Sequence, residues 1–276
     1  MSDNSILPLS LSPEEKRQFS KYCKLNNQTM SARLRELIRK DMGFTLLSHY
    51  KEKYQRDVID HVTNNKLSLI VKSRQMYMTT MLLSILLEHM IEDEGSGSYH
   101  FFSPNKESMK HAVDKFLLQC SDNNIDLSIQ NRNAYFTRMT LYNGANVEFS
   151  QMCHPNDMGS SRMIIVDEAA FIPKGDLTLA LSSLLMADKL AIASTPNEDS
   201  CFNHMAKKVF AGKSEFSPLI SHWSMNSYYC DRASSLSEID ADGHVRFSPV
   251  LKDVRNALGE SDAKLIYEQA FECLIL

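Results

Sequence analysis

A short polar stretch between two apolar segments constrains this chain more than any other feature. Residues 72–80 read Lys-Ser-Arg-Gln-Met-Tyr-Met-Thr-Thr, after the apolar run 67–71 and before the apolar helical pattern 81–87. A buried strand, a tight loop and a helix in this order form the frame of a phosphate-binding loop, in which backbone N–H groups at a helix N-terminus hold phosphate oxygens. The sequence therefore predicts a βα unit with an anion-binding turn at its centre.

The loop departs from the usual phosphate-binding pattern at two adjacent positions. Thr79 and Thr80 lie where such loops keep the magnesium-binding hydroxyl, but Tyr77 and Met78 stand in place of a Gly-Lys pair. A side chain at a positive-φ glycine position costs about 1–2 kcal/mol, and methionine cannot offset the charge of the outer phosphates. Lys72, at the first position of the loop, is the candidate substitute cation.

Two other predicted strands also end in polar residues. The apolar run 163–166 leads into Asp167 and Glu168, and the run 190–193 leads into Ser194 and Thr195. Ligands of open parallel sheets collect at the carboxyl ends of strands. In P-loop enzymes the first acid holds magnesium and the second polarises the attacking water. Each motif alone also fits an ordinary βα unit with solvated side chains, but three such strand ends in order are more specific.

Together the three motifs resemble the ATPase domain of tailed-phage large terminases, the motors that package DNA. The matching segments are Ser73–Thr80, Val166–Pro173 and Ser194–Asn197, and the resemblance runs from about Phe44 to the C-terminus. Only the Gly-Lys pair departs from the pattern. The chain stops at Leu276, about where the ATPase domain would meet the nuclease domain, so we expect no nuclease domain.

The resemblance implies ATP and Mg²⁺ as cofactors and a role for each matching residue. Gln55, which follows Tyr54, would contact adenine, and Arg162 is a candidate phosphate sensor, although a plain surface arginine is the slightly favoured alternative. The implied roles are nucleotide binding by Gln55, Lys72, Ser73, Gln75, Thr79 and Thr80, metal binding by Thr79 and Asp167, catalysis by Glu168 and Arg74, and coupling to DNA movement by Ser194 and Thr195.

The first 43 residues have the pattern of a separate module. Residues 6–11 alternate like a strand, Ser12-Pro13 begins a helix that reaches Cys23 or Lys24, and a second helix runs from Thr29 to Met42. Strand, helix and helix resemble a ribbon-helix-helix domain, which dimerises by pairing its strand. Ser10 and Thr29 are the candidate DNA contacts, by strand and helix N-terminus. The alternative is an oligomerisation or partner-docking module.

Charge and composition limit the remaining possibilities. The formal net charge is −4, yet residues 1–43 carry eight Lys and Arg against five Asp and Glu, so only the head of the chain is basic. A local nucleic-acid contact fits this distribution better than a body coated with DNA. The six cysteines lack a CxxC pair and indicate reduced thiols in the cytoplasm of a bacterial host, and the longest apolar runs are too short to span a membrane.

These observations predict an α/β fold with a P-loop-type, mostly parallel sheet at 44–276 and a strand-helix-helix module at 1–43. The favoured function is a terminase-like protein of phage DNA packaging or its control, with impaired ATP hydrolysis and a docking role. One alternative is an active packaging motor subunit that uses Lys72 in a deviant loop, and another is a ribbon-helix-helix DNA-binding regulator. Expected partners are DNA, terminase subunits or a portal, and a second copy of the chain paired through residues 1–43.

Overall fold

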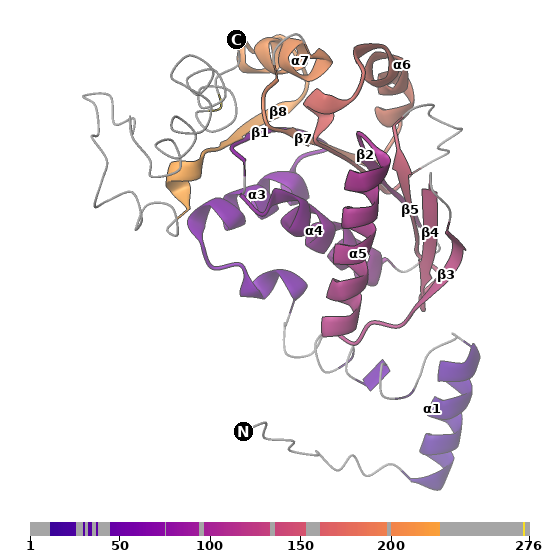
Figure 1. Cartoon of the computed structure of the whole chain (residues 1–276). Coiled ribbons are helices and arrows are strands. Elements are labelled where there is room, and N and C mark those ends of the chain that lie inside the picture. Colours follow the sequence, from indigo (N-terminus) through magenta and orange to yellow (C-terminus); the bar gives the residue numbers. More distant parts are fainter. Residues whose placement is uncertain are drawn as a thin grey trace, which may run out of the picture.

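The computed structural model describes residues 12–25, 30, 33–34, 37, 45–74, 76–93, 97–132, 136–152, 161–197, 200–226 and 273. Their centre is one eight-stranded sheet with helices packed against both faces (Figure 1). The expected α/β class is therefore confirmed. The predicted strand 6–11 lies outside the described residues, as do most residues of the second N-terminal helix.

The sheet is mostly parallel, with an antiparallel extension at one side. In spatial order its strands are β3-β4-β5-β2-β6-β7-β1-β8, and only the β3–β4 and β4–β5 pairs are antiparallel. The strands are β1 Leu67–Lys72, β2 Ser98–Ser103, β3 Leu127–Arg132, β4 Phe136–Leu141, β5 Asn146–Gln151, β6 Met163–Asp167, β7 Lys189–Ser194 and β8 Ser217–Ser221. Buried apolar runs such as that of β6 are typical of strands covered on both faces.

Two layers of helices cover the sheet. Helices α3 (Lys53–Asn64), α4 (Met78–Glu92) and α5 (Lys106–Asp122) bury their apolar sides in one core cluster, and α6 (Lys174–Leu184) and α7 (Cys201–Phe210) bury theirs in a second. Helix α4 is central because its apolar residues face all directions and nine of its side chains are buried. Three short 3₁₀ helices complete these layers, at Leu46–His49 (η1), Ala169–Phe171 (η2) and Trp223–Met225 (η3).

The strands predicted from the three motifs are confirmed. The Asn143-Gly144 pair between the apolar-rich runs 135–141 and 146–150 predicts a hairpin, and β4 and β5 do pair antiparallel around it, where Gly144 has a φ of 88° that glycine adopts freely. The sequence also predicts a helix from about Lys106 to Cys120, which is α5, capped by the Asn105 side chain. None of the helices in the described part of the chain is long and apolar enough to cross a membrane.

The first N-terminal helix is also confirmed, as α1 (Pro13–Leu25). Its start has the expected chemistry, because Pro13 occupies the first turn and Ser12 and Glu15 exchange side-chain-to-backbone hydrogen bonds of 2.8 and 3.3 Å. Met30, Arg33, Leu34 and Leu37 of the following segment are helical as well. Whether this module is a ribbon-helix-helix dimer stays a prediction.

Candidate nucleotide site

Three strand ends meet at one edge of the sheet. Strand β7 lies between β1 and β6, and the register pairs Val71 with Ser194 and Asp167 with Ala193. The ends of β1, β7 and β6 are therefore neighbours in space, although about 90 residues of chain separate the first from the third. This places the loop after β1 beside the two acids, as expected for parallel strands.

Lys72 is the cation at the centre of this edge. Its ammonium nitrogen lies 2.6 Å from Oε1 of Glu168 and 3.3 Å from Oγ1 of Thr195. The Lys72 side chain is only 5% exposed, whereas that of Glu168 is 30% exposed. A lysine taken out of water in this way needs partners for its charge. It therefore bridges the end of β7 and the residue after β6.

The Thr79 hydroxyl and the Asp167 carboxylate form a second contact across the site. Thr79 donates a hydrogen bond of 2.6 Å to Oδ2 of Asp167, and the backbone N–H of Glu168 donates one of 3.0 Å to Oδ1. Burial raises the pKa of Asp167, and the neighbouring Glu168 charge raises it further, against the opposing effect of Lys72. An anion in this environment favours a nearby cation.

Glu168 is held in an unusual backbone conformation. Its φ and ψ are 52° and 43°, in the left-handed region that non-glycine residues seldom enter. The other oxygen of its carboxylate, Oε2, is buried and lacks a hydrogen-bond partner among the described residues. Such strain and an unsatisfied polar atom are typical of functional sites. Hydroxyl and carboxylate oxygens also match the donor set that magnesium prefers, so the residues fit the cofactors that the sequence implied.

The left-handed turn that a glycine would make is present at Tyr77. Its φ and ψ are 54° and 20°, directly before α4, and its side chain is 63% exposed. Tyr77 is therefore open to solvent beside the loop. Met78 instead packs in the core cluster with Met76, at 2% exposure. The position that normally carries the phosphate-binding lysine is thus part of the hydrophobic core.

Several predicted site residues have structural contacts. Ser73 is buried; its N–H donates to the carbonyl of Ser221 and its hydroxyl accepts from the N–H of Trp223 at 2.9 Å, so it fastens the loop to β8 and η3. The amide oxygen of Gln55 accepts from the N–H of Glu52 in the capping box of α3. The nucleotide contacts expected of Ser73 and Gln55 stay predictions.

The remaining predicted site residues differ in burial, and some of them lie outside the described residues. Thr80 is half-buried in the first turn of α4, and Arg74 is exposed in the loop. Gln75, Ser10 and Thr29 lie outside the described residues. Ser194 is buried and accepts the N–H of Ala170, which ties the end of β7 to η2.

Arg162 does not lie with the phosphate loop. It precedes β6, five residues before Asp167, and its guanidinium pairs with Asp188 at 3.2 Å. At about 3.3 Å per strand residue, this is the opposite edge of the sheet. A phosphate-sensing role for Arg162 does not fit this geometry, and a surface arginine does.

Sequence reasoning missed two residues that shape the site. Asn197 donates to the carbonyl of Ala170 at 3.4 Å and its N–H donates to the side chain of Asn203 at 3.3 Å, so it joins the segment after β7 to η2 and α7. The backbone N–H of Trp223 donates to the hydroxyl of Ser73 and holds it in place. The sequence offers little sign of this contact, because the strand that leads to Trp223, β8, is short and contains Pro218. The small polar residues after an apolar strand were the available sign for Asn197.

Solved structures of large terminases share the fold of this chain. The large terminase of a thermophilic bacteriophage matches over 82% of this chain and 53% of its own, with a TM-score of 0.55 and 11% identity. The ATPase domain of the Thermus phage P74-26 large terminase matches over 84% of this chain and 96% of its own, with a TM-score of 0.54 and 13% identity. The fold is that of a large-terminase ATPase domain.

The same bacteriophage terminase has also been solved in complex with ADP, with a TM-score of 0.56 and 13% identity to this chain. A further structure of it contains ATP-gamma-S, with a TM-score of 0.53 and 14% identity. This chain spans about half the length of that terminase. No family model and no curated protein matches the sequence. The terminase likeness therefore rests on structure, at identities that show the fold alone.

Proposed function

We propose that this chain binds ATP with Mg²⁺ through a deviant phosphate loop and acts in phage DNA packaging or its control, with slow hydrolysis. The observation that carries the proposal is the position of Lys72. Its ammonium group lies 2.6 Å from Glu168 and 3.3 Å from Thr195, at the three strand ends where a terminase-like fold would take nucleotide. A charge at the first loop position thus stands in for the missing lysine at Met78.

The other described residues support the same assignment. Thr79 and Asp167, which are joined by a 2.6 Å hydrogen bond, would hold magnesium, and the N-terminus of α4 would face the phosphates. Bound magnesium would supply charge neutralisation for the phosphate oxygens. Lys72 would contact the outer phosphates, and Glu168 would accept a proton from the attacking water.

Slow hydrolysis follows from the pairing of the proposed base. Oε1 of the Glu168 carboxylate lies 2.6 Å from the ammonium of Lys72, so a cation already occupies the oxygen that would receive a proton from water. The same lysine cannot neutralise phosphate and Glu168 equally well. The left-handed Tyr77 adds strain to the loop that glycine would not have. A docking protein that keeps the nucleotide-binding shape would tolerate both features.

The second candidate is an active packaging motor subunit. Two observations favour it: the Thr79–Asp167 contact is intact, and the carboxylate of Glu168 lies at the same strand ends, against Lys72. Under this alternative, nucleotide binding would draw Lys72 away from Glu168 and release the base. Terminase subunits, a portal and DNA are the proposed partners in either case, in the cytoplasm of a bacterial host.

One assay separates these functions. Binding of a fluorescent ATP analogue and release of phosphate are measured with and without Mg²⁺ and duplex DNA, for the full chain and for Glu168→Gln. We expect magnesium-dependent binding with turnover close to background. Rapid DNA-stimulated turnover that Glu168→Gln lowers by about 10²–10⁴-fold, while exposed Glu107→Gln leaves it unchanged, would establish the motor. Absence of binding at millimolar ATP would overturn the proposal.

A further inference from the structure

The segment 16–35 is the most one-sidedly charged part of the chain. It contains six lysine and arginine residues and lacks aspartate and glutamate, in a protein whose formal net charge is −4. Four of these cations belong to α1. The two acids of α1, Glu14 and Glu15, sit in its first turn, where they complement the helix dipole. The rest of the helix is therefore purely cationic.

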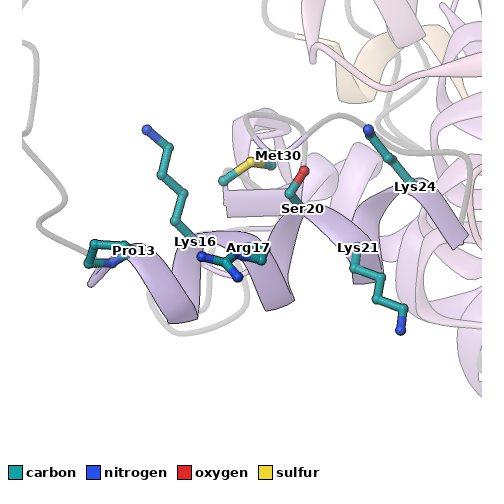
Figure 2. Close-up of a pocket in the computed structure, with 7 residues that line it drawn as sticks. All are labelled: Pro13, Lys16, Arg17, Ser20, Lys21, Lys24 and Met30. Atoms are coloured by element: carbon teal, nitrogen blue, oxygen red, sulfur yellow. The ribbon is translucent and has the colours of Figure 1, made fainter.

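The cations of α1 line one shallow hollow. Figure 2 shows Lys16, Ser20 and Lys24, which are spaced four residues apart on one face of α1, extending to the same side of the helix, where Met30 of the following segment also lies. Arg17 and Lys21 complete the cationic lining of this hollow, which has a volume of about 610 Å³. From Lys16 to Lys24 the row spans about 12 Å of helix.

Little of this charge is neutralised locally. Within the described residues, α1 forms one salt bridge, a 3.9 Å contact between Arg17 and Glu14, whose side chains are 79% and 67% exposed. Such an exposed pair contributes little. Glu15 is occupied by the N–H of Ser12. The charges of these lysines are therefore exposed to solvent and available to a polyanion.

The surface fits phosphates better than bases. Proteins that bind single strands use aromatic platforms on which bases stack. Of the two aromatic residues of α1, Phe19 is half-buried and the ring of Tyr22 carries the guanidinium of Arg33 at 5.5 Å. Lysines and a serine hydroxyl are instead suited to backbone phosphates, which fix a protein on a duplex without reading sequence.

From these observations we infer that the hollow on α1 is a binding surface for the phosphate backbone of duplex DNA. It involves Lys16, Lys21 and Lys24 and is distinct from the DNA contacts expected at Ser10 and Thr29. The binding is independent of DNA sequence because the contacts are to phosphates, and we expect it without nucleotide because the contacts of α1 among the described residues involve no residue of the Lys72 site. With about four phosphates neutralised, affinity falls by roughly 100-fold between 50 and 200 mM salt.

The test is fluorescence anisotropy of a labelled 30-base-pair duplex with the full chain and no nucleotide. The variant Lys16→Gln with Lys24→Gln keeps good helix formers at exposed positions. We expect it to lower affinity by about tenfold or more and to reduce the salt slope by about two. The matched control is Lys110→Gln with Lys115→Gln, which removes the same charge from exposed positions of α5. It should bind like the unmodified chain.

Three results would overturn the inference. They are no duplex binding at 50 mM NaCl, equal losses in the two double variants, and equal or tighter binding of a single strand of the same length. Light scattering is run in parallel. If light scattering gives a lower molecular mass for the α1 double variant while its DNA affinity is unchanged, the hollow is a contact between copies of the protein, and the inference is wrong. Because no nucleotide is present, failure here leaves the ATP site untested and failure of the ATP site leaves this surface intact.

Discussion

The ends of β1 and β6 are both followed by an unusual backbone turn, but the side chains at the two turns differ. Each is followed by a left-handed non-glycine residue, with φ of 54° at Tyr77 and 52° at Glu168. At Glu168 the turn directs a carboxylate onto Lys72, so the strain holds a contact in place. At Tyr77 the side chain points to solvent and gains little. Strain at a strand end thus indicates function only where the side chain it orients makes a contact.

The largest expected effect comes from removing the cation that joins the two strand ends. Lys72→Ala should abolish nucleotide binding, because loss of a charge-assisted contact of about 1.5–3 kcal/mol lowers affinity by roughly 10- to 100-fold. Titration calorimetry measures it, and circular dichroism checks that the protein remains folded. The matched control is Lys66→Ala, an exposed lysine at the opposite end of β1. Unchanged affinity would assign Lys72 a structural role.

The next effect concerns Asp167, the acid at the end of β6. Asp167→Asn removes the negative charge that the buried site offers to a metal, while keeping the side-chain volume. We expect nucleotide affinity to become independent of Mg²⁺. In the presence of the ion, the variant should therefore bind nucleotide about tenfold more weakly than the unmodified chain. The exposed Asp122→Asn on α5 is the control. A magnesium response that survives in Asp167→Asn would move the metal elsewhere.

A smaller effect is expected from relieving the backbone strain at Tyr77, whose side chain is exposed to solvent. Tyr77→Gly should stabilise the fold by about 1 kcal/mol, or roughly 2–4 °C in melting temperature, because glycine adopts positive φ freely. Nucleotide affinity should rise as well, because a loop without this side chain lets its backbone approach the phosphates more closely. Asn124→Gly is the control, since Asn124 has the same φ of 54° between α5 and β3. It should not change affinity.

A companion change carries the opposite risk. Adding Met78→Lys to Tyr77→Gly restores the usual Gly-Lys pair and should raise nucleotide affinity further. Met78 is 2% exposed in the core cluster, however, so the new lysine must leave the core or destabilise it. A folded double variant without a gain in affinity would show that the loop has diverged beyond these two residues.

The smallest effect concerns β7, which separates the two strand ends. Thr195→Val removes one of the two hydrogen bonds of the Lys72 ammonium and keeps the 2.6 Å contact with Glu168. We expect a loss of about 1 kcal/mol in unfolding free energy and less than about threefold in nucleotide affinity. Differential scanning calorimetry and the same titration measure both. A loss as large as that of Lys72→Ala would make Thr195 the principal partner of the lysine.

Much of the fold was predictable from local patterns. The apolar runs that end at Lys72, Asp167 and Ser194 specified three strands and the edge where they meet, since parallel strands bring their carboxyl ends together. The Asn-Gly turn specified the hairpin. Helices α3, α6 and α7 and strand β8 were not assigned, because these helices are shorter than α4 and α5 and β8 has only five residues, one of them Pro218.

The contacts within the site were less predictable. Chain order cannot show that β7 lies between β1 and β6, so the Lys72–Thr195 contact was not expected. Nor does the sequence show which way a left-handed residue points, so the high exposure of Tyr77 was not predictable. For Arg162 the surface alternative was slightly favoured, and its exposed pair with Asp188 before β6 agrees with that alternative.

The two outer strands of the sheet have a consequence for self-association. At one edge β8 contains Pro218, which has no N–H to offer a new neighbour, and at the other the register of β3 shifts between Ile129 and Asn131. A proline and an irregularity on the outermost strands both discourage another chain from adding to a sheet. Copies of this α/β body would therefore meet through helices and loops, and its sheet would resist growth into fibrils.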